Sequence, residues 1–575
     1  MLFGNRCKLP YDLNIIPDSV INYKICNIKD QKTYGVFINM CYFAFFKIVN
    51  TKYPFQKLDA TDLSKNLSNF IQSPFVNNDE QLNVFTMIIT ELCVKRLLNG
   101  NSNYDNYPDC EARSIYTLLM AIGENANKIK MFTIILNGIY KTFHYDYVKT
   151  TLKFNQRPYF KLFYTFISLF STIRNNDKVL NSENTKIQYM SLIAQYLRYL
   201  SPQYYPGFAL AWLELISSEN FMSCFLGDNG DNQASQTKDK NDKATDYLSL
   251  ISEIFIFLKN CSSKSVNKVF MNNVYKFIYL LCKTYPEFII EYCYIILISL
   301  PHENIYMQLK NLLLSTTIKK LEQYKNLNLE NKDLENEIKE NTLGDYNIKT
   351  SLDIVNILGK YKILSSIEKY IENPNYEIIK NICENLNNNN NVTFNFYVIQ
   401  SLVIYYGVNG LPKIKNLAEV YNFFFEMIKL MEMNNRIILM NSLLNNLKFP
   451  SNQTLYFVLI ILYILSNIKN EEIEEIFISL LFERLLIKPI PWGIELLFKK
   501  IIRGDKYDLN KTSYFNNING GQWFIESLKE FIEDKRFEKF NKYRANKMDM
   551  ILSKEKKKTK NDKNKGNKDD DGQNN

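Results

Sequence analysis

Apolar residues recur at spacings of three and four along most of the chain, from about Phe85 to Ile318 and again from about Ile348 to Leu552. This period is typical of amphipathic helices, and the sustained alternation of strands is not evident. Short polar breaks such as "LKFPSNQT" separate the apolar segments, as they do between antiparallel helices. The pattern predicts an all-α fold. Helix pairs in series favour a HEAT-like helical-repeat solenoid, although we found no fixed-period repeat motif.

Stretches without this pattern divide the predicted array. Residues 227–246 contain no large apolar residue, so we expect a solvated loop there, and the Asn-rich tract at 385–391 also predicts a loop. Residues 321–347 are rich in Lys, Glu and Asn with widely spaced Leu, which leaves an exposed helix or a loop open. The expected division is an N-terminal extension (1–80), a first half (81–320), a polar linker or insertion (321–347), a second half (348–552) and a disordered Lys/Asp-rich tail (553–575).

Composition supports a helical globular chain. Of 575 residues, 46% are hydrophobic and 14% aromatic, whereas Gly (18) and Pro (15) are scarce for this length. Few glycines and prolines disfavour turn-rich β folds and enzymes with glycine-rich loops. The longest apolar run, from Leu455 to Leu465, is shorter than the roughly 20 residues of a transmembrane helix. We therefore expect a buried core helix there and no membrane association.

Residue types that carry catalysis are thinly represented. There are two histidines, and the ten cysteines are scattered without a C-x-x-C pair. Metal-ligand spacings, a phosphate-binding G-x-x-x-x-G-K and a G-x-S-x-G elbow are absent from the sequence. We expect no catalytic residue, metal or cofactor. The start of the chain resembles no signal peptide, which with the unpaired cysteines predicts a cytosolic or nuclear location.

Charge permits a nucleic-acid partner without indicating one. The net charge is +10, but the last 23 residues hold eight Lys against five acids and so account for three of these charges. The rest of the chain is only mildly basic. Direct RNA contact by the solenoid or by the Lys-rich tail therefore stays an open alternative.

Proline-led segments mark where helices begin. Pro158, Pro206 and Pro491 each precede an apolar stripe of helical period, and Pro286 and Pro301 divide another segment into a helix pair. We interpret Trp212 as a packing anchor between helices and Glu214 as a residue on the opposite, exposed side. The singled-out residues, all assigned structural roles, are Arg157, Pro158, Pro206, Trp212, Glu214, Pro286, Pro301, Pro489, Pro491, Trp492 and Gly493.

Trp492 raises the question of a site or a structural joint. Two prolines precede it and end a helix near Ile487, and a second helix follows with its apolar stripe on Ile494, Leu497 and Phe498. Trp492 lies off this stripe in the first turn. Local physics therefore favours a residue that packs back against the preceding helix and fills the corner.

Six collinear segments resemble one family. The stretch "LFERLLIKPIPWGIELLFKKIIRGDKYDL" (481–509) is similar to a signature of the large scaffold subunit, subunit one, of the CCR-NOT deadenylase complex. The segments "FNQRPYF", "PGFALAWLELIS", "YPEFIIEYCYIILISLP", "QLKNLLLS" and "FNFYVIQSLVIYYG" resemble the C-terminal homology domain of the same family. The resemblance covers roughly residues 85 to 530.

The resemblance implies a non-catalytic HEAT-like domain that docks the Not-box subunits two and three or five. Through the complex it would support mRNA deadenylation, decay and translational repression, in the cytoplasm including P-bodies and also in the nucleus. RNA-binding repressors would be further partners. The polar 321–347 region replaces an expected proline-rich stretch, and the nuclease-binding portion of the family is not among these residues. A helical-repeat nucleic-acid-binding or transport adaptor is the alternative function.

Overall fold

The computed structural model describes residues 125–503, with internal gaps, and Tyr507. The longest gaps are 172–182, 228–237 and 408–416, and residues 319–351 are described only in part. The predictions for residues 1–80, for the array before residue 125 and after 503, and for the tail at 553–575 lie outside the described residues. Within the described part, the regular elements are helices and no strand occurs.

The first half of the described array runs to residue 316. Its elements are α5 (Asn125–Thr150), α6 (Arg157–Ser171), α7 (Glu183–Tyr199), the 3-10 turn η4 (Pro206–Phe208), α8 (Ala209–Ile216), α9 (Glu219–Leu226), α10 (Lys238–Asn260), α11 (Lys264–Thr284), α12 (Pro286–Glu291), α13 (Cys293–Ser299) and α14 (Met307–Leu314).

The second half contains the remaining helices. They are α16 (Leu334–Lys339), α17 (Leu352–Lys360), α18 (Ile363–Glu372), α19 (Tyr376–Asn387), α20 (Val392–Tyr405), α21 (Leu417–Leu430), α22 (Met433–Leu444), α23 (Asn452–Asn467), α24 (Glu471–Leu486) and α25 (Trp492–Arg503).

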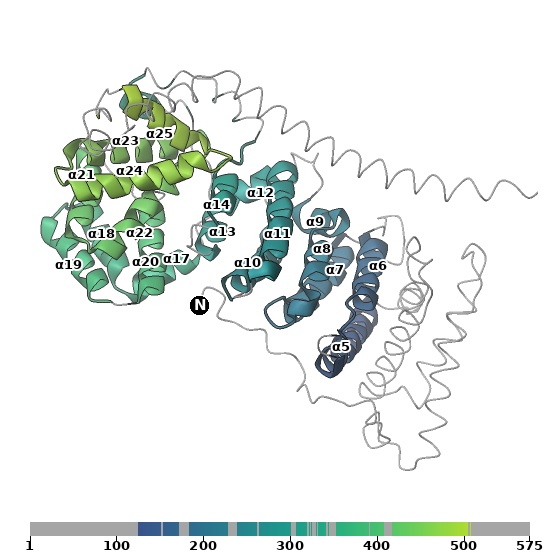
Figure 1. The fold of residues 1–575 in the computed structure, drawn as a ribbon. Helices are drawn as coiled ribbons and strands as arrows, with labels where there is room; N and C mark the ends of the chain where they lie inside the picture. The colour runs from purple at the N-terminus through teal and green to yellow at the C-terminus, as the bar shows by residue number, and fades with distance from the viewer. Residues whose placement is uncertain are drawn as a thin grey trace, which may run out of the picture.

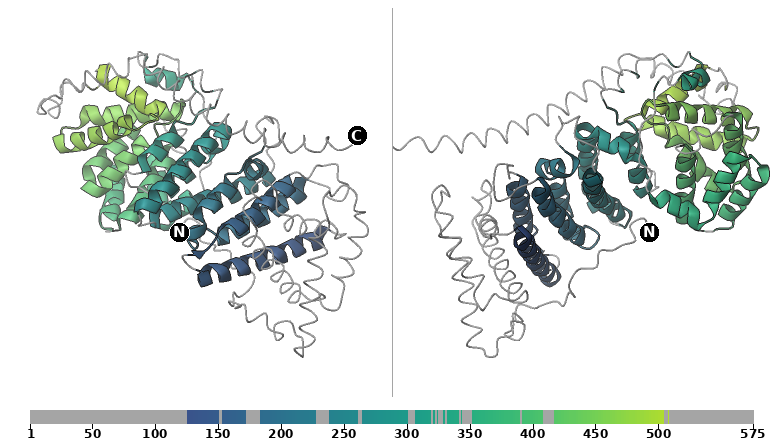
Figure 2. Two further views of the ribbon diagram at one scale, coloured as in Figure 1. Left: turned by 45° about the vertical axis from the view of Figure 1, so that its right-hand side comes forward. Right: turned by 180° about the vertical axis from the view of Figure 1, so that it is seen from behind.

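The helices stack in two layers that run through both halves (Figures 1 and 2). One layer places α5, α7, α10 and α13 in successive contact and continues through α20, α22 and α24. The other begins with α6, α8, α11 and α14, and in the second half α19, α21, α23 and α25 follow one another in the same way. Stacked helix pairs of this kind form a solenoid. The predicted all-α, HEAT-like fold is confirmed.

One large contiguous core extends from α5 to α25, and Ile290, Leu321 and Phe449 form a separate small cluster. The apolar stripe of α6 shows how the sequence builds it, because Tyr159, Phe163 and Phe166 are completely buried there. The apolar run from Leu455 to Leu465 lies in α23, whose buried side chains include almost every residue of the helix. The prediction of a buried core helix is confirmed. Among the described residues, no helix has both the length and the apolarity needed to cross a membrane.

Residues 227–246 differ in part from the predicted loop. Residues 228–237 lie outside the described residues, but α10 begins at Lys238, so the second part of this segment is helical. Ala244 and Tyr247 are already buried in that helix. Extending a packed helix by polar turns adds one hydrogen bond per residue without a new nucleation step, which is why a segment without large apolar residues can be helical.

Described parts of the polar region 321–347 pack against the array, while Lys332, Asp333 and Asn336 are exposed. Leu321, Leu329, Leu334 and Leu343 are buried, and the short helix α16 contacts α23. These leucines are spaced too widely to form a helical stripe, so the periodicity of the sequence did not predict their burial. The predicted polar linker or insertion therefore includes residues that contribute to the buried core.

The Asn-rich tract is helical in its first part. α19 extends to Asn387 and α20 begins at Val392, so the predicted loop is confined to the residues between them, of which 388, 389 and 391 are described. Asn395 Nδ2 donates to the carbonyls of Leu386 and Asn389, each at 2.9 Å, and to Asn435 Oδ1 at 3.0 Å. Carbonyls at a helix C-terminus lack partners within the helix. These amides satisfy them and fix the end of α19 to α20 and α22.

Candidate interaction surface

Arg157 and Pro158 open helix α6. The Asn155 side chain accepts a hydrogen bond from the Arg157 backbone amide at 3.0 Å, and Pro158 is buried in the first turn. Proline suits this position because its ring fixes a helical φ and the missing N–H has no intrahelical acceptor there. Arg157 is exposed, so this motif presents a cation on the surface beside a buried helix start.

Pro206, Trp212 and Glu214 occupy contrasting positions on one short segment. Pro206 begins the 3-10 turn that leads into α8. Trp212 is completely buried, and its Nε1–H donates to the Leu197 carbonyl at 2.7 Å. Glu214 lies on the exposed side of α8. The indole thus fills the core and satisfies a carbonyl near the end of α7, while the carboxylate faces outward.

Pro286 and Pro301 flank a pair of short helices. Pro286 is the first residue of α12, and Leu300, just ahead of Pro301, has the extended conformation expected before a proline (φ −64°, ψ 138°). Pro301 itself lies outside the described residues. A helix therefore ends just ahead of each of these two prolines, α11 at Thr284 and α13 at Ser299.

Gly493, more than Trp492, forms the joint at the start of α25. Helix α24 ends at Leu486, and a cis peptide bond precedes Pro489. Trp492 is half-buried against the core, whereas Pro491 and Gly493 are buried. The Gly493 amide donates to the Lys448 carbonyl at 2.9 Å. The side chain that the sequence drew attention to is thus at the edge of the joint, and the glycine lies at its centre.

A buried polar cluster joins the two halves beside this joint. Lys448 is completely buried, and its Nζ donates to Tyr294 Oη of α13 at 2.8 Å. Tyr294 in turn donates to Asn446 Oδ1 at 2.7 Å. The ammonium also lies 4.1 Å from the Tyr294 ring centroid and 5.1 Å from that of Phe449. Burial without a carboxylate partner lowers the pKa of Lys448 to about 7.

Arg484 and Asn311 make a second connection between the halves. Asn311 Nδ2 of α14 donates to the carbonyls of Arg484 at 2.9 Å and Ile487 at 2.6 Å, at the C-terminus of α24. Arg484 is 1% exposed, and its Nη2 donates to Asn445 Oδ1 at 2.6 Å. These bonds hold α14 against α24 and α22. The side chains of this connection are therefore structural.

The sequence analysis missed Lys448, Tyr294, Arg484 and Asn311. Arg484 offered a signal, because it follows Phe477 and Leu481 at the spacing of the buried stripe of α24. A polar residue on an apolar stripe predicts a buried polar contact. Lys448 lies in the polar break between two helices, where a solvated lysine is the normal expectation.

The described histidine and cysteine side chains, which could be reactive, are packed within the fold. His144 Nδ1 lies 2.7 Å from Tyr205 Oη, and burial lowers the histidine pKa. Cys282, Cys293 and Cys383 are free thiols, and burial raises the pKa of Cys293 to about 11. Among the described residues, no group of His, Cys, Asp and Glu is arranged to hold a metal ion. His302 lies outside them.

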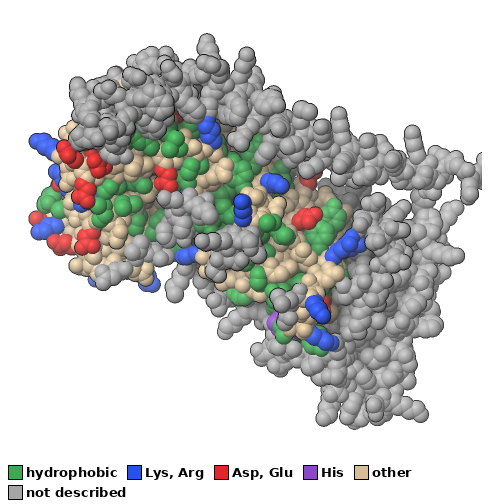
Figure 3. All heavy atoms as spheres, in the orientation of Figure 1, with side chains coloured by type: hydrophobic (Ala, Val, Ile, Leu, Met, Phe, Trp, Pro, Cys, Tyr) green, Lys and Arg blue, Asp and Glu red, His purple; other side chains and the backbone are tan. Residues whose placement is uncertain are grey.

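The outer surfaces of the two halves differ in their charged side chains. Figure 3 shows acidic side chains gathered over the second half, at the left, whereas Lys and Arg outnumber acids over the first half. Consecutive helices of one layer there each expose a large apolar residue: Tyr164 on α6, Leu210 on α8 and Val269 on α11. We call this surface the α6–α8–α11 face, and its residues are Lys161, Tyr164, Leu210, Glu214, Lys268, Val269 and Lys276.

Comparisons with solved structures support the described architecture. The NOT1 superfamily homology domain from Chaetomium thermophilum aligns with a TM-score of 0.69 and 16% identity, over 86% of this chain and 97% of that domain. A Not1 C-terminal domain in complex with Not4 aligns with a TM-score of 0.67 and 18% identity, over 84% of this chain and 98% of that domain. At these identities the likeness establishes the fold.

Sequence relatives point the same way. The CCR4-NOT transcription complex subunit let-711 of Caenorhabditis elegans is 25% identical over 468 residues, which are 75% of this chain and 17% of that protein. The general negative regulator of transcription subunit 1 of Saccharomyces cerevisiae is 24% identical over 433 residues, 69% of this chain and 20% of that protein. The chain thus spans about a fifth of the length of these relatives.

A family match settles the relationship that the six motifs indicated. The family described as "CCR4-Not complex component, Not1" matches residues 170–528, which is more than half of the chain. The match includes five of the six resembling motifs, at α8, α12 and α13, α14, α20 and the joint at Gly493, whereas FNQRPYF at 154–160 precedes it. The resemblance is confirmed, and this chain belongs to the Not1 family of CCR4-Not complex components.

Proposed function

We propose that this chain is a non-catalytic scaffold module of a CCR4-NOT complex, and that it binds other subunits of that complex through its helical array. The observation that carries the proposal is the Not1 family match over residues 170–528. The solved Not1 domain in complex with Not4 adds support, because it shares this fold over 84% of the chain.

The placement of reactive residues also supports a binding role. Trp212 satisfies a helix-end carbonyl, and Lys448 and Arg484 connect the two halves of the array. These groups maintain a rigid, extended support. Helical solenoids offer large extended surfaces for protein binding.

The specific partners that we propose are the Not-box subunits two and three or five, together with a Not4-type subunit and RNA-binding repressors. Through them the module would support mRNA deadenylation, decay and translational repression, in the cytoplasm, in P-bodies and in the nucleus. The alternative, direct binding of nucleic acid, draws on the Lys-rich surface of the first half.

Size-exclusion chromatography with light scattering tests the proposal. The chain is mixed at micromolar concentration with the Not-box heterodimer from the same source, and a ternary peak with the summed mass is expected. An unrelated HEAT-like array mixed with the same heterodimer is the control. Separate elution of this chain and the heterodimer would contradict the docking of Not-box subunits.

A further inference from the structure

The α6–α8–α11 face carries apolar side chains that are exposed to solvent. Tyr164 is 45% exposed, Leu210 43% and Val269 55%. Helix α6 contacts α8, and α8 contacts α11, so the three residues lie on neighbouring helices of one layer. The other side of each helix packs into the core, which places these residues on the outer surface. Clustered exposed apolar residues typically mark interaction sites.

Cations surround this apolar row. Helix α11 has four lysines and no acid in its sequence, and α6 adds Lys161 three residues before Tyr164. In the part of the chain that the structure describes, no ion pair joins Lys161, Lys268 or Lys276 to an acid. Glu214 on α8 is the acid between these cations. The face therefore has a surplus of positive charge, with three lysines against one carboxylate.

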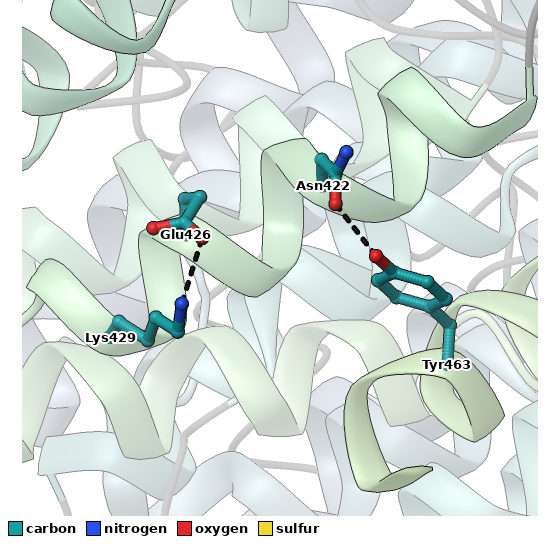
Figure 4. A network of polar contacts seen from close by, with 4 residues as sticks. All are labelled: Asn422, Glu426, Lys429 and Tyr463. Atoms are coloured by element: carbon teal, nitrogen blue, oxygen red, sulfur yellow. Dashed lines mark hydrogen bonds and ion pairs between the residues drawn. The ribbon is translucent and has the colours of Figure 1, made fainter. Parts of the chain in front are cut away.

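On the solvent-facing side of α21, by contrast, polar side chains pair with one another within the chain (Figure 4). Lys429 pairs with Glu426 at 2.9 Å, and its Nζ lies 4.1 Å from the Phe425 ring centroid. Tyr463 donates to Asn422 at 2.7 Å. Polar groups there have partners within the chain. The unpaired lysines of the α6–α8–α11 face instead resemble one half of an interface.

We propose that the α6–α8–α11 face binds an acidic, amphipathic segment of a partner subunit. The proposal rests on the proposed scaffold function and names the surface for one partner. Apolar side chains of the segment would cover Tyr164, Leu210 and Val269, and its carboxylates would approach the lysines. Charge complementarity of this kind guides association and orients the segment.

Helix spacing sets the expected pattern of the segment. Packed helices lie about 8–10 Å apart, and a segment in the polyproline II conformation advances about 3.1 Å per residue with three residues per turn. A segment of this kind presents every third side chain to the three helices it crosses, so it needs apolar residues about three positions apart, with acids between them. RNA fits this face less well, because Glu214 would repel phosphates and Tyr164 is the one exposed aromatic ring in the row.

The test uses the full chain and the Not-box heterodimer, with Kd measured by biolayer interferometry. The Leu210→Ser and Val269→Ser double variant removes two apolar contacts, and the Lys161→Glu, Lys268→Glu and Lys276→Glu triple variant reverses the charge. Each is expected to weaken binding by about tenfold or more, the usual effect of losing central contacts. Leu486→Ser, at a residue that is 63% exposed in the second half, is the matched control and should bind like the wild type.

The outcomes separate this proposal from the scaffold function. If the heterodimer does not bind the wild-type chain, the proposed docking of Not-box subunits fails. If it binds the wild type and both face variants equally well, the scaffold function stands and the assignment of this face is wrong. A single-stranded oligouridylate serves as the second probe. Loss of oligouridylate binding in the charge-reversal variant, with heterodimer binding unchanged, would make the face a nucleic-acid surface and overturn the proposal.

Discussion

Gly493 of α25 lies against the backbone of Leu447, at a distance that leaves no room for a side chain. A Cβ on Gly493 would be 2.8 Å from the Leu447 carbonyl carbon and 2.5 Å from Thr454 Cγ2. At the same place, the Gly493 amide donates to the Lys448 carbonyl. The absence of a side chain is what allows α25 to start in contact with the end of α22 and the beginning of α23.

Gly493→Ala should therefore destabilise the protein. Because the nearest atoms are largely backbone, the methyl group forces α25 to shift, and overpacking of this type costs about 1–3 kcal/mol or more. Thermal unfolding followed by circular dichroism measures the effect. Gly359→Ala in α17 is the matched control, since nothing lies within 4 Å of its Cβ and alanine favours helices by up to about 1 kcal/mol. A Tm for Gly493→Ala at or above the wild-type value would contradict the close approach.

The fold could be predicted from the sequence because helical periodicity is a local signal. The stripe on Ile494, Leu497 and Phe498 is completely buried, as the spacing indicated. Prolines marked helix starts for the same reason, since their ring restricts φ whatever the tertiary structure. Local signals of this kind fix element type and the side that faces the core.

Contacts between distant segments could not be predicted in the same way. Lys448 meets Tyr294 from a distant part of the sequence, and nothing in "LKFPSNQT" indicates that partner. Gly493 appeared as one letter of a family motif, whereas its importance comes from the approach of Leu447. The exposure of apolar residues such as Leu210 could not be predicted either, because an apolar residue in a sequence is normally assigned to the core.

Trp212 and Trp492 should differ in their contribution to stability. Trp212 is completely buried, so Trp212→Ala should cost about 3–5 kcal/mol. Trp492 is half-buried, and its replacement by alanine should cost less than this, because the transfer term follows the apolar area removed from water. Denaturant unfolding of both variants measures the difference. Equal losses in the free energy of unfolding would show that Trp492 is a buried joint. Loss of partner binding at an unchanged Tm would show that Trp492 is part of a binding site.

The buried amide pair Asn395 and Asn435 should contribute more to stability than an exposed hydrogen bond does. Asn395→Ala leaves carbonyls at the end of α19 with fewer donors, and an unsatisfied buried group costs about 1–3 kcal/mol. Asn422→Ala, which removes the exposed bond from Tyr463, is the control and should change stability by about 0.5 kcal/mol or less. A double-mutant cycle with Asn435→Ala should show non-additive losses, whereas additive losses would mean that the two amides act independently.

Lys448 should make stability depend on pH near neutrality. Its pKa is about 7 in the folded protein, whereas the ordinary value for lysine is 10.5, so between these values the unfolded chain binds more protons than the folded one. Stability from this group therefore rises with pH through that range, by up to about 1.4 kcal/mol per pH unit. The neighbouring Cys293 and Tyr294 act in the opposite direction, because burial raises both pKa values. These two groups lower stability only as the pH approaches 9.0 and 10.0, the ordinary pKa values at which the cysteine and tyrosine of the unfolded chain lose their protons.

Lys448→Met isolates this contribution when unfolding is compared below the titration range of those neighbours. Between about pH 6.5 and 8, the wild type should gain about 1 kcal/mol relative to the variant, because the folded lysine loses its proton while the unfolded lysine keeps it. Groups that do not contact Lys448 contribute equally to both proteins and cancel in the difference. Lys469→Met, at an exposed position after α23, is the control and should show no such change. A constant difference between wild type and Lys448→Met over this range would mean that the buried lysine keeps its proton, held by Tyr294 and the two aromatic rings.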